Sequence, residues 1–138
     1  MEDLQVALRD KLDLMYREAR SRLAIGKLDE GILLAETGWK ELPEPKFGWD
    51  VSKSYAHALA LVYRDTNRYH EALSIMSELF KSGTVKSHQD QPYFITGTIY
   101  FEMGDVENAR KWLEEANRIS KGRCFRDEPE KYERFLKS

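Results

Sequence analysis

The amino-acid sequence predicts an all-α fold in which three helical hairpins are followed by a C-terminal capping helix, about seven helices in one domain over residues 1–138. Two observations support this prediction. Apolar residues recur every three or four positions along most of the chain, which is the period of an amphipathic helix. Glycine, asparagine or proline interrupts that period where helices would end. No segment shows the pattern of a strand.

The first hairpin is expected over residues 3–42. Its first helix continues to a stop at Gly26, and Pro43 closes the second helix. Gly31 lies inside that second helix, where glycine costs about 1 kcal/mol relative to alanine. We therefore expect a close contact between the two helices at Gly31.

Residues 43–52, PEPKFGWDVS, are expected to form a linker. Its two prolines exclude a helix, and Phe47 and Trp49 are too apolar for an idle tether. Two interpretations are open. The favoured one is that the linker folds back and covers the hairpins, and the other is that it protrudes and binds a partner.

The second hairpin is expected over residues 53–82, with Ser52 as a candidate N-cap and Asn67-Arg68 as the turn. The linker that follows, residues 83–91, carries a small insertion. The third hairpin is expected over residues 91–121.

Small residues characterise the third hairpin. Gly97 and Ala109 would allow its two helices to approach closely. Gly104 is expected to end the first of these helices, and Asp105 is placed to cap the second. This hairpin is the most completely specified part of the chain.

The final segment, residues 127–137, is expected to be a capping helix. Asp127 is its candidate N-cap, and Tyr132 and Phe135 belong to its short apolar face. This helix would cover the open end of the third hairpin, above Phe125.

The order of residues in the third hairpin resembles the tetratricopeptide repeat (TPR), in which W-x2-L-G-x2-Y, A-x3-F and P recur over 34 residues. The matching positions are Tyr93, Thr96, Gly97, Tyr100, Ala109, Leu113 and Lys121, of which Tyr93, Thr96 and Lys121 depart from the pattern. The second hairpin repeats the order and the first does so in degenerate form. The resemblance implies a right-handed stack whose first helices line a concave groove.

The resemblance implies a non-catalytic module that binds a partner protein or peptide through this groove. Aromatic and arginine side chains are the usual anchors of interfaces. Helical spacing gives the candidate groove residues as Tyr16, Arg20, Leu23, His57, Leu61, Arg64, Phe94, Thr98 and Phe101. Alternatively, these residues pack on the next hairpin.

More specific interpretations also follow from the resemblance. The subgroup that grips chaperone tails needs lysine, arginine and asparagine donors, and the matching positions here are Tyr16, Arg20, Ala58, Gln91 and Ile95. Chaperone-tail binding is therefore disfavoured. The short chain and its LPEPKFGWD stretch are similar to small bacterial TPR-like immunity proteins, which block a cognate toxin. Another alternative is a self-associating structural subunit, a homo-oligomer.

Composition excludes several other classes. A net charge of −2 with 33% charged residues gives no electrostatic case for nucleic acid or an anionic membrane. No leader or membrane span is expected, and the lone Cys124 fits a reducing compartment, so a cytoplasmic protein is expected.

No enzyme, cofactor or metal is expected either. Histidine and cysteine show no metal-ligand spacing, and no phosphate-binding or nucleophile motif occurs. His57 is the one histidine with a plausible catalytic position, where it would act with a nearby carboxylate. The favoured interpretation is that His57 is an ordinary half-exposed polar residue.

Overall fold

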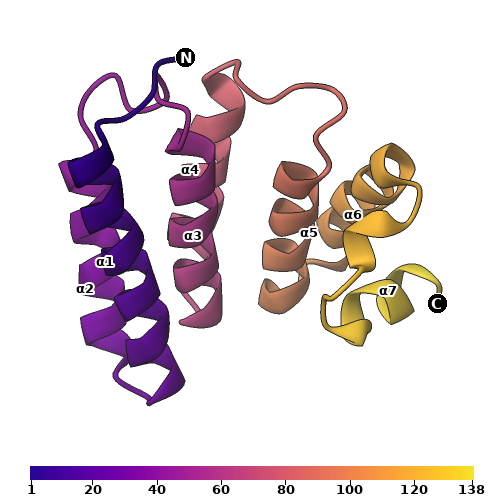
Figure 1. The fold of residues 1–138 in the computed structure, drawn as a ribbon. Coiled ribbons are helices and arrows are strands. Elements are labelled where there is room, and N and C mark those ends of the chain that lie inside the picture. The colour runs from indigo at the N-terminus through magenta and orange to yellow at the C-terminus, as the bar shows by residue number, and fades with distance from the viewer. The chain divides into compact units, whose positions relative to one another are not determined.

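The computed structural model describes all residues, 1–138, and confirms the all-α fold built from consecutive helical hairpins (Figure 1). The helices are α1 (Val6–Ala24), α2 (Leu28–Glu41), α3 (Ser52–Asp65), α4 (Tyr69–Lys81), α5 (Gln91–Met103), α6 (Val106–Ser120), the 3-10 helix η1 (Arg123–Phe125) and α7 (Glu130–Leu136). The only β-type pairing is an isolated bridge between Glu2 and Trp49.

The chain divides into two compact units, and each is described by itself. The first unit, Met1–Ser82, holds the hairpins α1–α2 and α3–α4. The second unit, Gly83–Ser138, holds the hairpin α5–α6 together with η1 and α7. A single domain over residues 1–138 stays a prediction.

In the first unit, a glycine allows α1 and α2 to touch. A Cβ atom added to Gly31 would overlap the Leu23 side chain and would lie 2.9 Å from the Ala19 carbonyl oxygen. The expected close contact at Gly31 is therefore confirmed. Because the backbone itself blocks a side chain there, glycine is required for this packing.

In the second unit, the turn between α5 and α6 uses the chemistry expected of it. Gly104 ends α5 with φ of +87°, in the left-handed region that glycine adopts without strain. The side chain of Asp105 then accepts a hydrogen bond of 3.2 Å from the backbone N–H of Asn108 and caps α6.

The cap at Asp105 leads to a stability prediction. We expect Asp105→Ala to lower the free energy of unfolding of the second unit by about 1 kcal/mol, because the N–H of Asn108 loses its partner. Fluorine NMR of fluorotryptophan during urea unfolding measures this, since Trp112 lies on α6. Glu107→Ala, at an exposed position in the same turn, should cost less, and an equal loss in both variants would contradict the capping role.

The linker of residues 43–52 packs against the C-terminal end of α2 within the first unit. Lys46 Nζ donates to the Trp39 carbonyl at 2.6 Å, at the C-terminal end of α2, and the Phe47 ring lies 5.5 Å from the Trp39 ring. Trp49 Nε1 donates to the Pro43 carbonyl at 2.9 Å. These contacts agree with the interpretation in which the linker folds back.

Two expected N-caps are wrong. The Ser52 hydroxyl donates to the Lys46 carbonyl at 2.6 Å and accepts the Trp49 N–H, so it ties the linker and does not cap α3, which has Val51 at its N-cap position. Asp127 does not cap α7 either. Pro129 holds the N-cap position in an extended conformation, so α7 begins only at Glu130.

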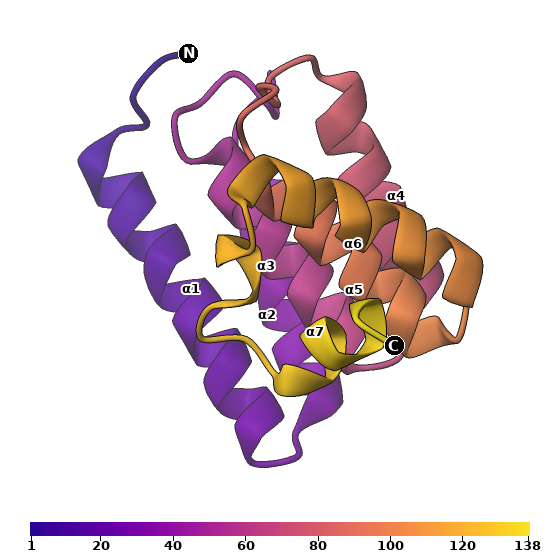
Figure 2. The same cartoon turned by 90° about the vertical axis from the view of Figure 1, so that its right-hand side faces the viewer.

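The last helix closes the second unit as predicted for a capping helix (Figure 2). Tyr132 of α7 is 2% exposed, and its ring meets the ring of Phe94 at 5.8 Å and the ring of Phe101 at 5.3 Å. Phe125 of η1 contacts Phe94 from another side. Helix α7 therefore shares the aromatic core of this unit.

Candidate functional site

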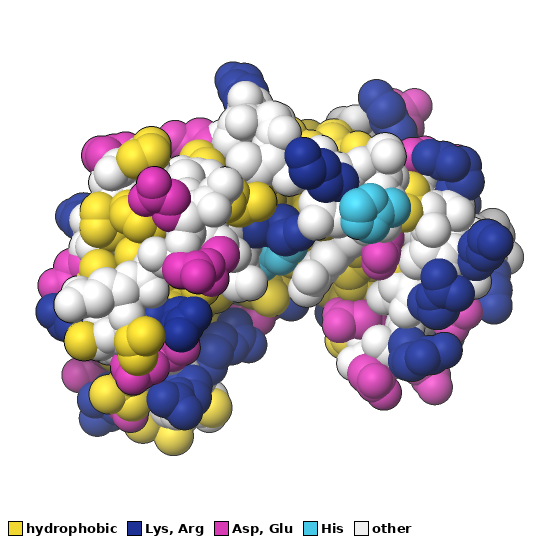
Figure 3. All heavy atoms as spheres, turned by 45° about the horizontal axis from the view of Figure 1, so that its top comes forward, with side chains coloured by type: hydrophobic (Ala, Val, Ile, Leu, Met, Phe, Trp, Pro, Cys, Tyr) yellow, Lys and Arg dark blue, Asp and Glu magenta, His cyan; other side chains and the backbone are white.

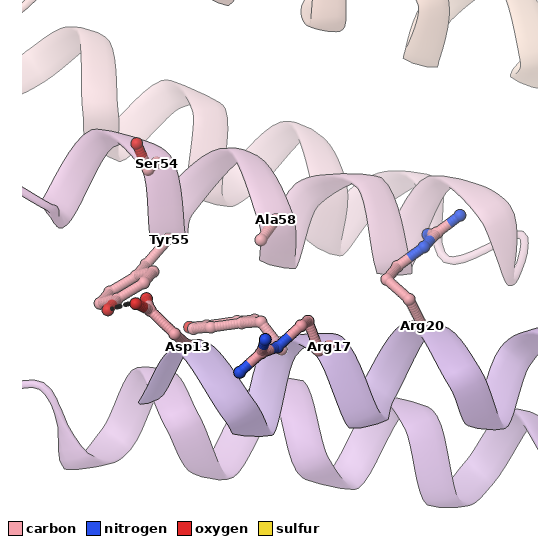
Figure 4. A pocket seen from close by; sticks show the side chains of 7 residues that line it. Asp13, Arg17, Arg20, Ser54, Tyr55 and Ala58 are labelled. Carbon is pink, nitrogen blue, oxygen red and sulfur yellow. Dashed lines mark hydrogen bonds between the residues drawn. The ribbon is translucent and has the colours of Figure 1, made fainter. Parts of the chain in front are cut away.

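An open cleft of about 510 Å³ lies between α1 and α3 in the first unit (Figure 4). Helix α1 contributes residues of one face to the cleft, and α3 contributes residues one turn apart. The lining residues are Asp13, Tyr16, Arg17 and Arg20 from α1, and Ser54, Tyr55 and Ala58 from α3.

Aromatic rings form the floor of the cleft. The Tyr16 and Tyr55 rings stack with centroids 4.9 Å apart and an interplanar angle of 24°. The Tyr55 hydroxyl donates to Asp13 Oδ1 at 2.6 Å, as Figure 4 shows. Burial and this hydrogen bond to Asp13 both raise the pKa of Tyr55, so its hydroxyl stays protonated and fixed at neutral pH.

The rim of the cleft is cationic. The exposed Arg17 side chain has no carboxylate within ion-pair distance, whereas Arg20 Nη1 lies 3.0 Å from Asp65 Oδ2. Arg64 Nε lies 2.8 Å from the other oxygen of Asp65. Asp65 therefore holds two guanidinium groups in place, and Arg17 remains available to a ligand.

The face of the molecule drawn in Figure 3 carries mixed charge. Figure 3 shows basic and acidic side chains interspersed, with apolar side chains among them. This agrees with the net charge of −2. None of the helices combines the length and the apolarity that crossing a membrane requires.

Comparison with known proteins adds one match. The family profile described as tetratricopeptide repeat matches residues 91–122, which contain α5 and α6. No curated protein and no solved structure gives a significant match. Together with the consecutive helical hairpins, the matched repeat supports a TPR-like helical repeat protein. TPR repeats are typically non-catalytic and support protein–protein interaction in general.

The predicted groove residues of this TPR-like protein occupy different environments in the first unit. Tyr16 and Arg20 line the cleft. Leu23 packs against Gly31, while Leu61 and Arg64 are half-buried on α3. The structure thus brings two of these residues into one cleft and uses Leu23 in the contact between α1 and α2.

The predicted groove residues of the second unit are mostly buried. Phe94 is 5% exposed and Thr98 is fully buried, with its hydroxyl donating to the Ile95 carbonyl at 2.7 Å. Phe101 is half-buried and meets the rings of Tyr132 and Phe135. Phe94 and Phe101 therefore contribute to the core beneath α7, and Thr98 is buried within α5.

His57 is not the half-exposed residue that helical spacing suggested. Its side chain is 5% exposed, and Nε2 has no hydrogen-bond partner. Burial, with a smaller contribution from the charge of Lys53, lowers the pKa of His57 to about 4. His57 is therefore neutral at pH 7 and packs as part of the interior.

This burial leads to a pH prediction. A histidine whose folded pKa is depressed binds protons more tightly in the unfolded chain, so stability is lost as pH falls from about 6.5 toward about 4. We expect a loss of about 1 kcal/mol by pH 5.5. Urea unfolding of wild type and His57→Gln across this range measures the difference.

The matched control for His57→Gln is His70→Gln, because His70 is exposed. The dependence of the free energy of unfolding on pH should be the same for wild type and His70→Gln. Only His57→Gln should make this dependence shallower. Parallel profiles for all three proteins would show that His57 titrates normally.

Helical spacing missed five residues of the cleft. These are Asp13, Arg17, Ser54, Tyr55 and Ala58, which lie within one turn of the predicted residues on their helices. Arg17 directly follows Tyr16, and Ser54 and Ala58 are one turn apart. The signal was therefore present in the sequence as a polar row beside the predicted stripe. No group of three His, Cys, Asp or Glu side chains is placed to hold a metal ion.

Proposed function

We propose that this TPR-like protein is a non-catalytic interaction module that binds a partner polypeptide through the cleft between α1 and α3. The observation that carries the proposal is an open cleft with an aromatic floor and an unpaired arginine on its rim. Tyrosine and arginine are enriched among residues that dominate binding energy. Arg20 and Tyr16 are the groove residues that the proposal retains at its centre.

The chemistry of the cleft favours one kind of peptide segment. An apolar side chain would rest on the Tyr16 and Tyr55 rings, and a neighbouring aspartate or glutamate would pair with Arg17. Asp13 keeps its negative charge while it accepts the Tyr55 hydroxyl, so the ligand carboxylate is expected beside Arg17 and away from Asp13. The expected ligand therefore combines an apolar residue with an adjacent acidic one.

Peptide selection tests this proposal. Peptides selected from a displayed random library on the immobilised full chain should be enriched in apolar–acidic pairs. Their affinity should fall about thirtyfold for Arg17→Glu, which corresponds to about 2 kcal/mol at an interface anchor. Fluorescence anisotropy with labelled peptides measures this. Ser54→Trp, which fills the cleft without changing its charge, should also abolish binding.

The matched control is Lys111→Glu, an equal change of charge at an exposed position of α6. It should leave the affinity unchanged. Loss of binding in Phe47→Ala or Trp49→Ala, with binding kept in Arg17→Glu and Ser54→Trp, would move the site to the linker. Phe94 and Phe101 are unsuitable for this test because their truncation removes core contacts.

A further inference from the structure

A second cleft, in the other unit, is lined mainly by cations. It has a volume of about 320 Å³ and lies where the chain passes from α6 through η1 toward α7. Lys121, Arg123 and Arg126 line it together with Gly122, Phe125 and Glu133. Three positive charges thus meet one negative charge in a single open cleft.

The three cations are unpaired. Lys121, Arg123 and Arg126 are exposed, and no carboxylate lies within ion-pair distance of any of them. The one carboxylate of the cleft, Glu133, is engaged at 3.0 Å by Lys137, outside the lining. Among the other exposed cations of this unit, Arg118, Lys131 and Arg134 have carboxylate partners, whereas Lys86 and Lys111 have none but lie outside the cleft.

The backbone that carries the cations is held firmly. Lys121 and Gly122 both have left-handed backbone conformations, with φ of +53° and +85°, which turn the chain sharply after α6. Cys124 N donates to Ser120 Oγ at 3.0 Å. Cys124 and Phe125 are buried, so Arg123 and Arg126 on either side of them are fixed at their Cα atoms. The spacing of the charges is therefore built into the fold.

We propose that this cleft binds a phosphate monoester dianion. A phosphate monoester carries a charge of about −1.5 to −2 at pH 7 and presents three acceptor oxygens. Three unpaired cations match that charge better than they match a single carboxylate, and two guanidinium groups can each donate a bidentate pair of hydrogen bonds. Clusters of arginine are a recurring way to recognise phosphorylated segments.

The same charge pattern argues against nucleic acid as the ligand. Nucleic-acid binding proteins use extended basic surfaces that follow a phosphodiester backbone. Here three unpaired cations gather in one small cleft, and the face drawn in Figure 3 mixes basic and acidic side chains. The phosphate group can come from a small phosphorylated compound or from a phosphorylated side chain of a polypeptide, and both present the same dianion.

Titration of the isotope-labelled full chain, followed by amide NMR, tests the proposal. The probes are phosphoserine, a phosphoserine peptide with neutral flanking residues, and the same peptide with glutamate in place of phosphoserine. We expect saturable shifts at Gly122, Arg123 and Cys124 with both phosphorylated probes. At least tenfold tighter binding of the peptide identifies a polypeptide source, and equal affinities identify a small phosphorylated compound.

Variants sharpen the test. Arg123→Gln combined with Arg126→Gln should weaken phosphoserine binding at least tenfold, while Lys86→Gln combined with Lys111→Gln, at exposed positions of the same unit, should not change it. Glu133→Gln should strengthen binding, because it removes the only carboxylate of the cleft. If the double arginine variant does not fold, the affinity of Glu133→Gln for phosphoserine tests the proposal.

Three results would overturn the proposal. The first is the absence of saturable shifts with phosphorylated probes. The second is equal affinity for the glutamate peptide, which would indicate a carboxylate site. The third is tighter binding of a single-stranded oligonucleotide than of either phosphorylated probe at the same salt concentration.

Discussion

Truncation of the chain after Gly122 is expected to destabilise the second unit by about 3 kcal/mol or more, because large aromatic groups leave its core. Phe94 would lose the Phe125 and Tyr132 rings, and Phe101 would lose the rings of Tyr132 and Phe135. The apolar face uncovered on α5 should also promote aggregation, since a terminal repeat needs a polar outer face. Urea unfolding followed at Trp112 and light scattering measure both effects.

The matched control for the truncation ends the chain after Leu136. It removes only Lys137 and Ser138, which are exposed, and should change stability by less than about 0.5 kcal/mol. Tyr132→Ala in the full chain should reproduce much of the loss. If the chain ending at Gly122 stays monomeric with unchanged stability, residues 127–137 are a tail and do not act as a cap.

Gly97→Leu is expected to destabilise the second unit by about 1–3 kcal/mol or more through overpacking. A Cβ atom at position 97 would lie 2.7 Å from Leu113 Cγ and 3.1 Å from Leu113 N. The side chain of Leu113 can move, but its backbone nitrogen is fixed within α6. The two helices would therefore have to separate, which loosens the contact between α5 and α6 along its length.

Two further variants isolate the contact at Gly97. Lys111→Leu introduces the same side chain at an exposed position of α6 and should be nearly neutral. Leu113→Ala should offset part of the cost of Gly97→Leu, so that the double variant is more stable than the sum of the single effects predicts. A neutral Gly97→Leu would contradict the close approach of α5 and α6.

The fold could be predicted largely from local features. Helical periodicity marked each α-helix but not the 3-10 helix η1. Gly97, Gly104 and Asp105 specify a helix contact, a helix end and a cap by steric and hydrogen-bonding rules that act over a few residues. The predictions of N-caps at Ser52 and Asp127 were wrong because these two residues are not governed by local rules alone. Their roles depend on the path of the neighbouring linker, which local preference does not specify.

The candidate site was harder to predict because it depends on which neighbour covers each helix face. Tyr16 and Arg20 line a cleft, as expected of groove residues. Phe94 stands at the position equivalent to Tyr16, and Phe101 at the position equivalent to Leu23, yet the Tyr132 ring contacts both. Helical spacing gives the direction of a side chain from its own helix. It does not say whether a distant segment, here α7, returns to bury that side chain.

Site-specific photo-crosslinking can detect a partner polypeptide that contacts the cleft between α1 and α3. An amino acid with a compact aliphatic diazirine, small enough to leave the cleft open, replaces Ser54 in the cleft and, in separate control variants, Lys111 on α6 or Phe47 or Trp49 in the linker, in cells that naturally produce the protein. We expect a light-dependent adduct between position 54 and a different polypeptide, and no such adduct from position 111. An adduct of two copies of this chain at position 54, or adducts only from Phe47 and Trp49 in the linker, would contradict this expectation.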